Sequence, residues 1–465
     1  MTESVIKPQR WAVVGGGMLG MTTALRLSQA GHHVTLFESA DGFGGLADAW
    51  QLGDVTWDRH YHVTLLSDSW FRTILKELGL DDDMQWVETR TGFYTDGRLH
   101  SMSSSLEFLK FPPLSLWSKF RLGLTIFAGS RIKNWRALEG MLVADWLRKW
   151  SGTKTFEKMW LPLLRSKLGD NYTKTSAAFI WATIARLYAA RRTGLKKELF
   201  GYLPGGYGRI LENYTQKLAS AGVELRPGHA VKSVTADSMS KDIIVDVNDG
   251  QERFDQVVLT VPSGLVPRMV PELSDEQKAR HEQIEYQGIV CVSLLLKKPL
   301  ADFYVTNITD GNAPFTGVIE MSTLVDPEEF NGHSLVYLPY YVPQDDDIFD
   351  RSDEEIRQMS LDGISGMYPE FSPDDVVEFK VSRVRRVMAI STLNYSTKLP
   401  PIQTSVPGVF VVNSAQIVNG TLNVNETVKL AETATAEILL PASAARQHEI
   451  HHENQQENQH AKTIC

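Results

Sequence analysis

Three glycines and an acidic residue near the N-terminus have the spacing of a nucleotide site. The pattern Gly15-x-Gly17-x-x-Gly20 follows an apolar run and precedes a helical pattern. One glycine permits a tight turn, one lets the backbone approach a pyrophosphate, and one allows a helix to pack closely on a strand. Glu38 follows Gly20 by 18 residues and ends the next apolar run, where its carboxylate can accept hydrogen bonds from ribose hydroxyls. These residues predict a dinucleotide site that disfavours a 2′-phosphate.

The helix that begins at this turn adds backbone donors. Met18 and Leu19 are its first residues. The N–H groups of a first helical turn have no partner within the helix and carry a partial positive charge, so they can bind phosphate. We therefore expect Met18, Leu19 and Gly20 to contact the cofactor through their amides. The alternative is a glycine-rich turn that binds no ligand.

Two further loops favour FAD over the shorter NAD. Gly44, Gly45 and Leu46 belong to a second glycine-rich loop, and the longer dinucleotide needs a second clamp of this kind. Near the end of the chain, a buried-strand pattern leads into Asn413 and Gln416, whose segment offers amides to the ribityl and pyrophosphate region. The sequence thus predicts FAD, held without a covalent bond.

A parallel sheet must position these loops. Strand patterns separated by one helix begin the chain, and a mostly helical stretch rich in Trp, Leu, Arg and Lys interrupts them. The strand patterns cover residues 11–14, 33–38, 223–225, 230–234, 242–247, 257–261, 290–296, 335–341 and 408–412, and the helical stretch covers residues 81–204. We predict an α/β fold, in which a Rossmann-type FAD-binding domain is interleaved with an α+β substrate domain.

The expected domains are discontinuous in sequence. Residues 1–80, 205–265 and 385–445 are assigned to the FAD-binding domain, residues 81–204 and 266–384 to the substrate domain, and residues 446–465 to a disordered tail. The tail is rich in His and Gln and lacks apolar periodicity, which is typical of a solvated segment. Nothing fixes its histidines in a ligand geometry, so no metal site is predicted.

At this point the chain resembles the flavin-containing amine oxidase superfamily, in the branch near protoporphyrinogen oxidase, phytoene desaturase and UDP-galactopyranose mutase. The resemblance covers residues 10 to 440. It rests on the segments 13–17 with Glu38, the Gly44-Gly45 loop, 58–62 (DRHYH), 203–207 (LPGGY), 257–262 and 408–416. These motifs are specific for the fold and the cofactor, and they are not specific for the substrate.

The resemblance also implies roles for single residues. It implies that the backbone of Val231 touches adenine, and that the segment containing His60 and His62 lies beside the isoalloxazine. Imidazole titrates near neutrality, so either histidine could exchange a proton with substrate or reduced flavin. The alternative is a structural pair that holds a loop. This chain has Asn413-Ser414 where many relatives have Gly-Asp, so we expect Asn413 or the neighbouring amides to make the contact near the pyrophosphate.

Composition excludes several other functions. The formal net charge of −9 disfavours nucleic acid, which needs a broad basic surface. Two cysteines cannot form a disulfide framework or a cysteine metal site, and neither lies near the flavin motifs in sequence. The first apolar run begins too early to leave room for a signal peptide. We therefore expect a cytoplasmic protein without a covalent flavin link.

Two stretches could contact a partner. Residues 108–126 mix Phe, Leu and Trp with Lys119 and Arg121, and a basic run from Arg186 to Lys197 follows. Either could contact an anionic lipid surface as a peripheral membrane protein, or hold a phosphate-bearing substrate. A solvated amphipathic helix is the simpler interpretation of the first stretch. A small-molecule substrate is expected, and the sequence does not predict the oligomeric state.

The sequence therefore predicts an FAD-dependent oxidoreductase that removes a hydride and a proton from a carbon–carbon or carbon–nitrogen bond. Two alternatives remain open. One is a redox-neutral, flavin-dependent nucleotide-sugar mutase, which the basic run and the setting of His62 favour. The other is a flavin-binding scaffold without catalysis.

Overall fold

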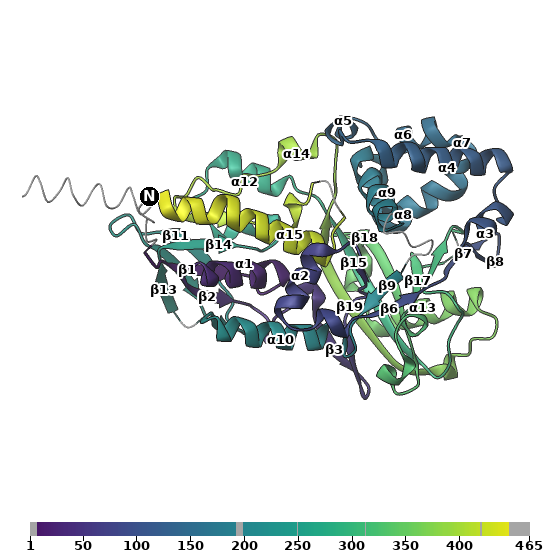
Figure 1. Cartoon of the computed structure of the whole chain (residues 1–465), viewed down its shortest axis with the longest axis horizontal. Helices are drawn as coiled ribbons and strands as arrows, with labels where there is room; N and C mark the ends of the chain where they lie inside the picture. Colours follow the sequence, from purple (N-terminus) through teal and green to yellow (C-terminus); the bar gives the residue numbers. More distant parts are fainter. Residues whose placement is uncertain (1–6, 192–198, 249, 312, 419–420, 446–465) are drawn as a thin grey trace, which may run out of the picture.

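The computed structural model describes residues 7–191, 199–248, 250–311, 313–418 and 421–445. In Figure 1 a small sheet with long helices lies at the left, and a larger sheet and a group of helices lie at the right. The predicted tail, residues 446–465, lies outside the described residues.

The small sheet has five parallel strands in the order β10-β2-β1-β14-β20. Their bounds are β1 Arg10–Val14, β2 His33–Phe37, β10 Glu224–Arg226, β14 Gln256–Leu259 and β20 Val409–Val411. The central strands are apolar and buried, as expected for parallel strands with both faces covered. The α/β fold and its Rossmann-type sheet are thus confirmed.

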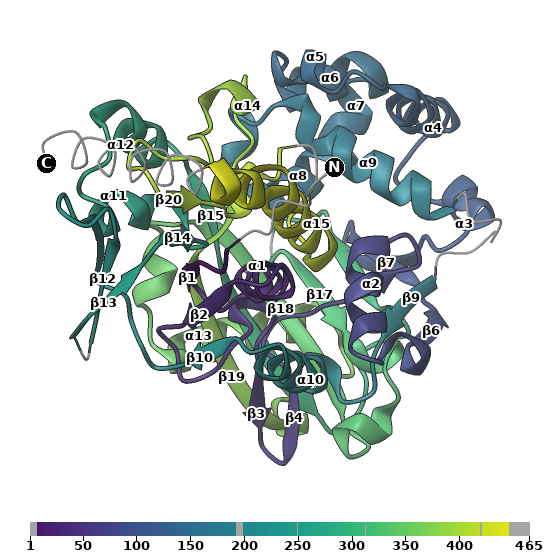
Figure 2. The ribbon, with the colours of Figure 1, turned by 60° about the vertical axis from the view of Figure 1, so that its left-hand side comes forward.

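Helices cover one face of this sheet. They are α1 Met18–Gln29, α2 Ser69–Glu77, α10 Gly206–Ser220 and α15 Val424–Ala434. Helix α1 lies between α15 and α10 (Figure 1, Figure 2). Trp11 and Phe410 project from the sheet into their shared apolar core, where the two rings stack with centroids 5.8 Å apart.

An antiparallel meander covers the other face. Its strands are β11 Ser233–Ala236, β12 Ile243–Val247 and β13 Gly250–Phe254, and it lies in sequence between β10 and β14. Phe254 packs edge-on against Phe37 of the parallel sheet, with ring centroids 5.9 Å apart. The short helices α11 Val266–Met269 and α12 Asp275–Glu282 follow β14.

The larger sheet has seven strands in the order β19-β15-β18-β17-β16-β7-β8. Their bounds are β7 Thr91–Thr95, β8 Arg98–Ser101, β15 Tyr286–Leu296, β16 Val305–Ile308, β17 Gly317–Glu320, β18 Ser334–Pro343 and β19 Val376–Ala389. Every residue of β15 is buried, because α13 Asp353–Met367 covers one face of the sheet and residues 52–61 cover the other. This second face therefore looks toward the five-stranded parallel sheet.

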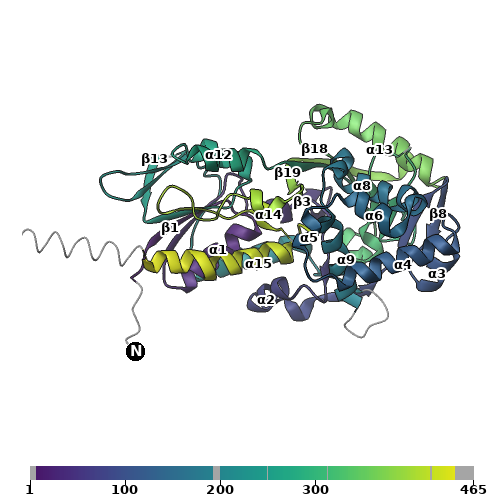
Figure 3. The ribbon, with the colours of Figure 1, turned by 90° about the horizontal axis from the view of Figure 1, so that it is seen from above.

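A helical lobe packs beside the larger sheet (Figure 1, Figure 3). Its helices are α3 Ser105–Lys110, α4 Leu116–Arg131, α5 Arg136–Glu139, α6 Val143–Ser151, α7 Thr153–Thr155, α8 Leu161–Leu168 and α9 Ala177–Arg191. The remaining elements are β3 Ala49–Leu52, β4 Val55–Asp58, β5 Thr64–Leu65, β6 Gln85–Glu88, β9 Leu199–Tyr202 and α14 Tyr395–Lys398.

The prediction that residues 81–204 are mostly helical is confirmed, because helices α3 to α9 lie in this range. Strands β6, β7, β8 and β9 lie in the same range and are not predicted by the sequence patterns. Strand β7 pairs in parallel with β16, whose residues are more than 200 positions later in the chain. Such remote partners decide strand formation more strongly than local composition does.

The glycine turn gives a test of the fold itself. A Cβ on Gly20 would lie 1.8 Å from Gly15 O, which the backbone cannot accommodate without moving. We expect Gly20→Ala to lower the free energy of unfolding by about 3 kcal/mol or more, as overpacking does. Chemical denaturation would measure this. Gly366→Ala in α13, where a Cβ meets nothing within 4 Å, is the matched control and should be neutral or stabilising. Equal stability of the two variants would contradict the packing described here.

Candidate functional site

The turn between β1 and α1 has the geometry of an anion site. Gly15 has a φ of +110°, and its N–H donates to Phe37 O over 2.8 Å, which ties the turn to β2. Gly17 is the N-cap of α1, and no side chain caps that helix. The first-turn amides of Met18, Leu19 and Gly20 therefore lack a side-chain acceptor there. The side chains of Met18 and Leu19 are buried in the core, so only their amides could serve a ligand.

Gly17 differs from its neighbours in the space around it. A Cβ added there would approach Gly44 O and the Cα of Gly45 no closer than 3.9 Å. A Cβ on Gly15 would instead lie 2.5 Å from Oγ1 of Thr260. The protein itself thus tolerates a side chain at Gly17, and this position is the one at which a phosphate could approach the backbone.

Glu38 lies beside this turn, at the end of β2. Its Oε2 accepts a hydrogen bond from Gly16 N at 2.7 Å, and its Oε1 accepts from Ala40 N at 2.8 Å. Residues 228–231 lie next to it, since His229 N donates to Glu38 O at 2.8 Å and Gly228 N donates to Ala40 O. Val231 is partly buried against the core on the meander side. The structure therefore brings Glu38 and the segment of Val231 together at one end of the candidate site.

The second glycine-rich loop packs directly on the first. Gly44 N donates to Gly16 O at 2.9 Å, and Gly44 and Gly45 have φ values of +132° and +60° that disfavour other residues. Leu46 follows in a short 3₁₀ turn, and its carbonyl oxygen faces His60. The structure thus brings Gly15, Gly17, Gly20, Gly44, Gly45 and Leu46 into one cradle.

In the loop after β20, the side chains of Asn413 and Gln416 form hydrogen bonds with backbone groups of the protein itself. Asn413 Oδ1 accepts from Ala415 N, and its Nδ2 donates to Val261 O, each at 3.0 Å. Gln416 Oε1 accepts from Asn413 N at 2.7 Å, and its Nε2 donates to Val411 O at 3.1 Å. Since these side chains hold the loop against β14 and β20, any cofactor contact from this loop would come from its backbone.

His60 is held by internal partners on both sides. Its Nδ1 lies 3.3 Å from Leu46 O, which can only accept, so Nδ1 carries the proton and Nε2 accepts from Ser382 Oγ at 3.1 Å. Burial, with a contribution from His62, lowers the pKa of His60 from 6.5 to about 4. A buried neutral imidazole with both nitrogens engaged joins the glycine loop to β19. The predicted proton-transfer role does not fit His60.

His62 has a different setting. Its ring packs on Tyr207 with centroids 4.6 Å apart, and its Nδ1 lies 3.6 Å from Asp58 Oδ2, beyond hydrogen-bond length. Asp58 is buried and its Oδ1 accepts from Tyr207 N, at the start of α10. His62 lines a small pocket with Trp57 and other, mostly apolar, residues. Of the two histidines, His62 is the one that lines a pocket.

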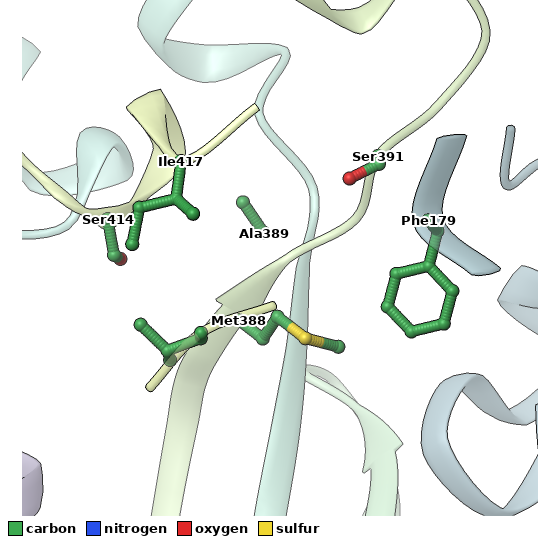
Figure 4. A pocket seen from close by; sticks show the side chains of 7 residues that line it. Phe179, Met388, Ala389, Ser391, Ser414 and Ile417 are labelled. Carbon is green, nitrogen blue, oxygen red and sulfur yellow. The ribbon is translucent and has the colours of Figure 1, made fainter. Parts of the chain in front are cut away.

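A second cavity lies where the two parts of the molecule meet. It is small, and Figure 4 shows its lining: Phe179 of α9, Met388 and Ala389 at the end of β19, Ser391, Ser414 and Ile417. Ser414 belongs to the loop after β20, whereas Phe179 belongs to the helical lobe. A ligand in this cavity would contact the nucleotide-binding sheet and the lobe at once.

Sequence analysis missed a polar cluster near the same end of β15. Tyr61 and Tyr341 join their hydroxyls over 2.9 Å, and Lys167 Nζ lies 3.3 Å and 3.2 Å from these two oxygens. Burial raises the pKa of Tyr61 well above 10. The three residues come from the loop after β4, from β18 and from α8. No local pattern could reveal them, since only the fold brings these segments together.

Of the predicted basic run, only Arg186 has a described side chain, and it forms an ion pair within the protein. Arg186 Nη2 lies 3.1 Å from Oδ2 of Asp68, a buried carboxyl whose pKa is raised by burial despite this pair. The side chain of Arg191 and all of Arg192, Lys196 and Lys197 lie outside the described residues. The charge of Arg186 is therefore already compensated.

Comparison with known proteins identifies the family. The sequence model for "Flavin containing amine oxidoreductase" matches residues 19–439. The chain belongs to this family and is a flavin-dependent oxidoreductase. The resemblance inferred from its motifs is thereby confirmed.

Curated relatives and solved structures agree with this assignment. The chain is 21% identical to a 15-cis-phytoene desaturase of Capsicum annuum over 398 residues, 81% of this chain and 67% of that protein. It is 24% identical to a coproporphyrinogen III oxidase of Mycobacterium tuberculosis over 321 residues, 62% of this chain and 66% of that protein. An oxidoreductase from Methanosarcina mazei has the same fold, with a TM-score of 0.73 and 17% identity over 92% of this chain and 100% of that one. Putrescine oxidase bound to putrescine gives a TM-score of 0.71 and 16% identity over 93% and 99%.

Two buried histidines should make stability depend on pH. His281 has, like His60, a pKa lowered by burial from 6.5 to about 4. The unfolded chain therefore binds more protons between these values, and stability is complete above about pH 6.5 and falls toward pH 4. We expect each histidine to contribute up to about 1.4 kcal/mol per pH unit in this window.

Urea unfolding of His281→Gln between pH 4.5 and 7.5 would measure this contribution. The variant should show a shallower dependence than the parent protein, by about one proton. Ala279→Gln, at an exposed position of the same helix α12, removes no titrating group and is the control that should leave the dependence unchanged. A slope that His281→Gln does not alter would show that this imidazole is not neutral in the folded state.

Proposed function

We propose that the flavin is FAD, and that the protein oxidises a small organic molecule by removing a hydride and a proton from a C–C or C–N bond. The names of its relatives support both bond types, since they include a phytoene desaturase and a putrescine oxidase. A bound flavin supplies the hydride acceptor. The chain's own residues then bind and orient the substrate and take up its proton.

The residues present fit FAD. The uncapped start of α1 and the open position at Gly17 suit a pyrophosphate, and Glu38 suits a ribose. The segment of Val231 lies where a nucleobase would follow that ribose. The Gly44 loop supplies the second clamp. We assign the loop at Asn413 to the flavin side through its amides.

The observation that carries the proposal is the cavity shared by Ser414, Met388 and Phe179. It joins the loop after β20, which belongs to the nucleotide-binding sheet, to the larger sheet and the helical lobe. A substrate held there would meet apolar side chains on the lobe side and backbone amides on the nucleotide side. The Tyr61, Tyr341 and Lys167 cluster adds polar contacts near the same end of β15.

We also propose a small-molecule substrate and a cytoplasmic location. Cys291 is a buried free thiol on β15, and burial raises its pKa, so it is not poised for disulfide chemistry. This fits a reducing compartment.

A variant of Gly17 tests the identity and place of the cofactor. Gly17→Leu should fold, because the protein leaves room at this position, but its side chain would occupy the pyrophosphate approach. We expect purified parent protein to release FAD on heating, and the variant to retain less than a tenth as much, with its circular dichroism spectrum unchanged. Gly42→Ala, where a Cβ meets nothing within 4 Å, is the matched control. Full FAD content in Gly17→Leu would show that the phosphates bind elsewhere.

Anaerobic reduction separates an oxidoreductase from a mutase. A true substrate should bleach the flavin absorbance without added dithionite, because the substrate itself supplies the electrons. Amines, polyenes, porphyrinogens and nucleotide sugars form the panel to be mixed with the protein in a stopped-flow instrument. Turnover of a nucleotide sugar only after chemical reduction, with no net loss of electrons, would support the mutase instead.

His62 is the residue to vary in that experiment. Its imidazole lines the pocket beside Trp57 and Tyr207 rather than the one at Ser414, and the family resemblance implies that its segment lies beside the isoalloxazine. We therefore expect His62→Ala to slow bleaching by about a hundredfold, at the low end of the range for a lost acid or base. His33→Ala, on the surface at the start of β2, should leave the rate unchanged. An unchanged rate in His62→Ala would assign that imidazole a structural role.

A further inference from the structure

Helix α4 faces outward with its apolar side. Leu116, Trp117 and Phe120 are 73%, 66% and 60% exposed. Leu124 and Phe127 continue the same face at helical spacing. The buried side instead contains Ser118, Lys119, Leu122, Thr125 and Gly129. The expected solvated amphipathic helix is therefore wrong in orientation, since a surface helix normally turns its polar side to water.

Helix α3 extends this apolar face. Leu106 and Leu109 are also largely exposed, and the rings of Trp117 and Phe120 stack with centroids 5.6 Å apart. Figure 1 and Figure 3 place α3 and α4 together at the end of the molecule remote from the nucleotide-binding sheet. We call the outward side chains of Leu106, Leu109, Leu116, Trp117, Phe120, Leu124 and Phe127 the apolar face. Contiguous exposed apolar groups of this kind mark an interaction site.

The buried side of α4 holds the helix firmly in this orientation. Lys119 Nζ donates to Leu109 O at 2.7 Å, and so joins α4 to α3. Arg121 donates to the backbone oxygens of Trp150 and Lys149, at the end of α6. A Cβ on Gly129 would already touch Ile184 of α9. Because its polar groups are used inward, α4 cannot rotate to hide the apolar face without breaking these bonds.

Positive charge surrounds the apolar face. Residues 105–136 contain six lysines and arginines and one acidic residue, Glu107, in a chain whose net charge is −9. Glu107 is engaged with Ser101 Oγ and Ser103 N at 2.7 Å each. Lys110, Arg131, Lys133 and Arg136 are exposed, and they adjoin the residues of this face in sequence. The guanidinium of Arg131 lies 4.9 Å from the ring centre of Phe127.

We propose that the apolar face docks on the surface of an anionic phospholipid bilayer. Apolar side chains would enter the boundary between headgroups and acyl chains, and the basic rim would contact lipid phosphates. The like charges on this rim disfavour a second copy of the chain as the occupant. Among the described residues, no helix is long and apolar enough to cross a membrane, so docking is on the surface. The inference does not depend on the flavin chemistry.

Vesicle binding by the complete flavoprotein tests the proposal. We expect the protein to sediment with vesicles of phosphatidylcholine and phosphatidylglycerol in a 7:3 ratio (roughly 30% anionic lipid), and at least tenfold less with phosphatidylcholine alone. Binding should weaken with rising salt. The triple variant Leu116→Ser, Trp117→Ser, Phe120→Ser should lose at least tenfold in partitioning while it keeps its flavin and its melting temperature. Met239→Ser, at an exposed methionine on the meander, is the control and should bind as the parent does.

Two further results decide the orientation and the occupant. Brominated lipids should quench part of the tryptophan fluorescence of the parent, and less of it in Trp117→Phe, which retains binding. The double variant Arg131→Gln, Lys133→Gln should lose the preference for anionic vesicles. The proposal is overturned if the parent ignores anionic vesicles, if the triple variant binds them equally well, or if the parent is instead an oligomer that the triple variant converts to monomer.

Discussion

The close packing of α1 against the end of β1 determines where the other parts of the site lie. Gly20 meets Gly15 O without room for a Cβ, and Thr260 donates its hydroxyl to Val14 O and Gly15 O at 3.0 Å each. The first turn is thus fixed from both sides, by its own helix and by the end of β14. The loop at Gly44 then packs on Gly16. Together, these three contacts direct the start of α1 toward one edge of the sheet.

From that edge, a series of polar contacts extends to the larger sheet. Leu46 O binds His60, and His60 binds Ser382 of β19, whose other neighbour Cys291 lies on β15. Tyr337 of β18 donates to Asp58 O, and Asp58 holds the start of α10. These contacts fix the position of the five-stranded parallel sheet relative to the seven-stranded sheet. Neutral His60 suits this position, because a charge there would be buried without a counterion.

Local spacing made the β1–α1–β2 unit predictable. Gly15, Gly17, Gly20 and Glu38 lie within one short unit, whose geometry follows from its own sequence. Local spacing did not predict β7, because its strand partner β16 is remote in sequence. It also did not predict the cluster of Lys167 with Tyr61 and Tyr341, because these residues come from three separate segments. It also failed for the orientation of α4, because periodicity shows that a helix has two faces and not which of them the lobe will cover. Remote contacts decided each of these cases.

The strand order of the nucleotide-binding sheet has a consequence for biosynthesis. Strand β1 leaves the ribosome long before its neighbour β14, which begins at Gln256, and before the edge strand β20, which ends at Val411. The turn at Gly15 can therefore be completed only after Thr260 has been made, and the loop at Asn413 only after β20 has been made. Nascent chains shorter than this expose the apolar flanks of β1 and need protection from aggregation. With the Asn413 loop assigned to the flavin as proposed, cofactor capture follows the synthesis of β20.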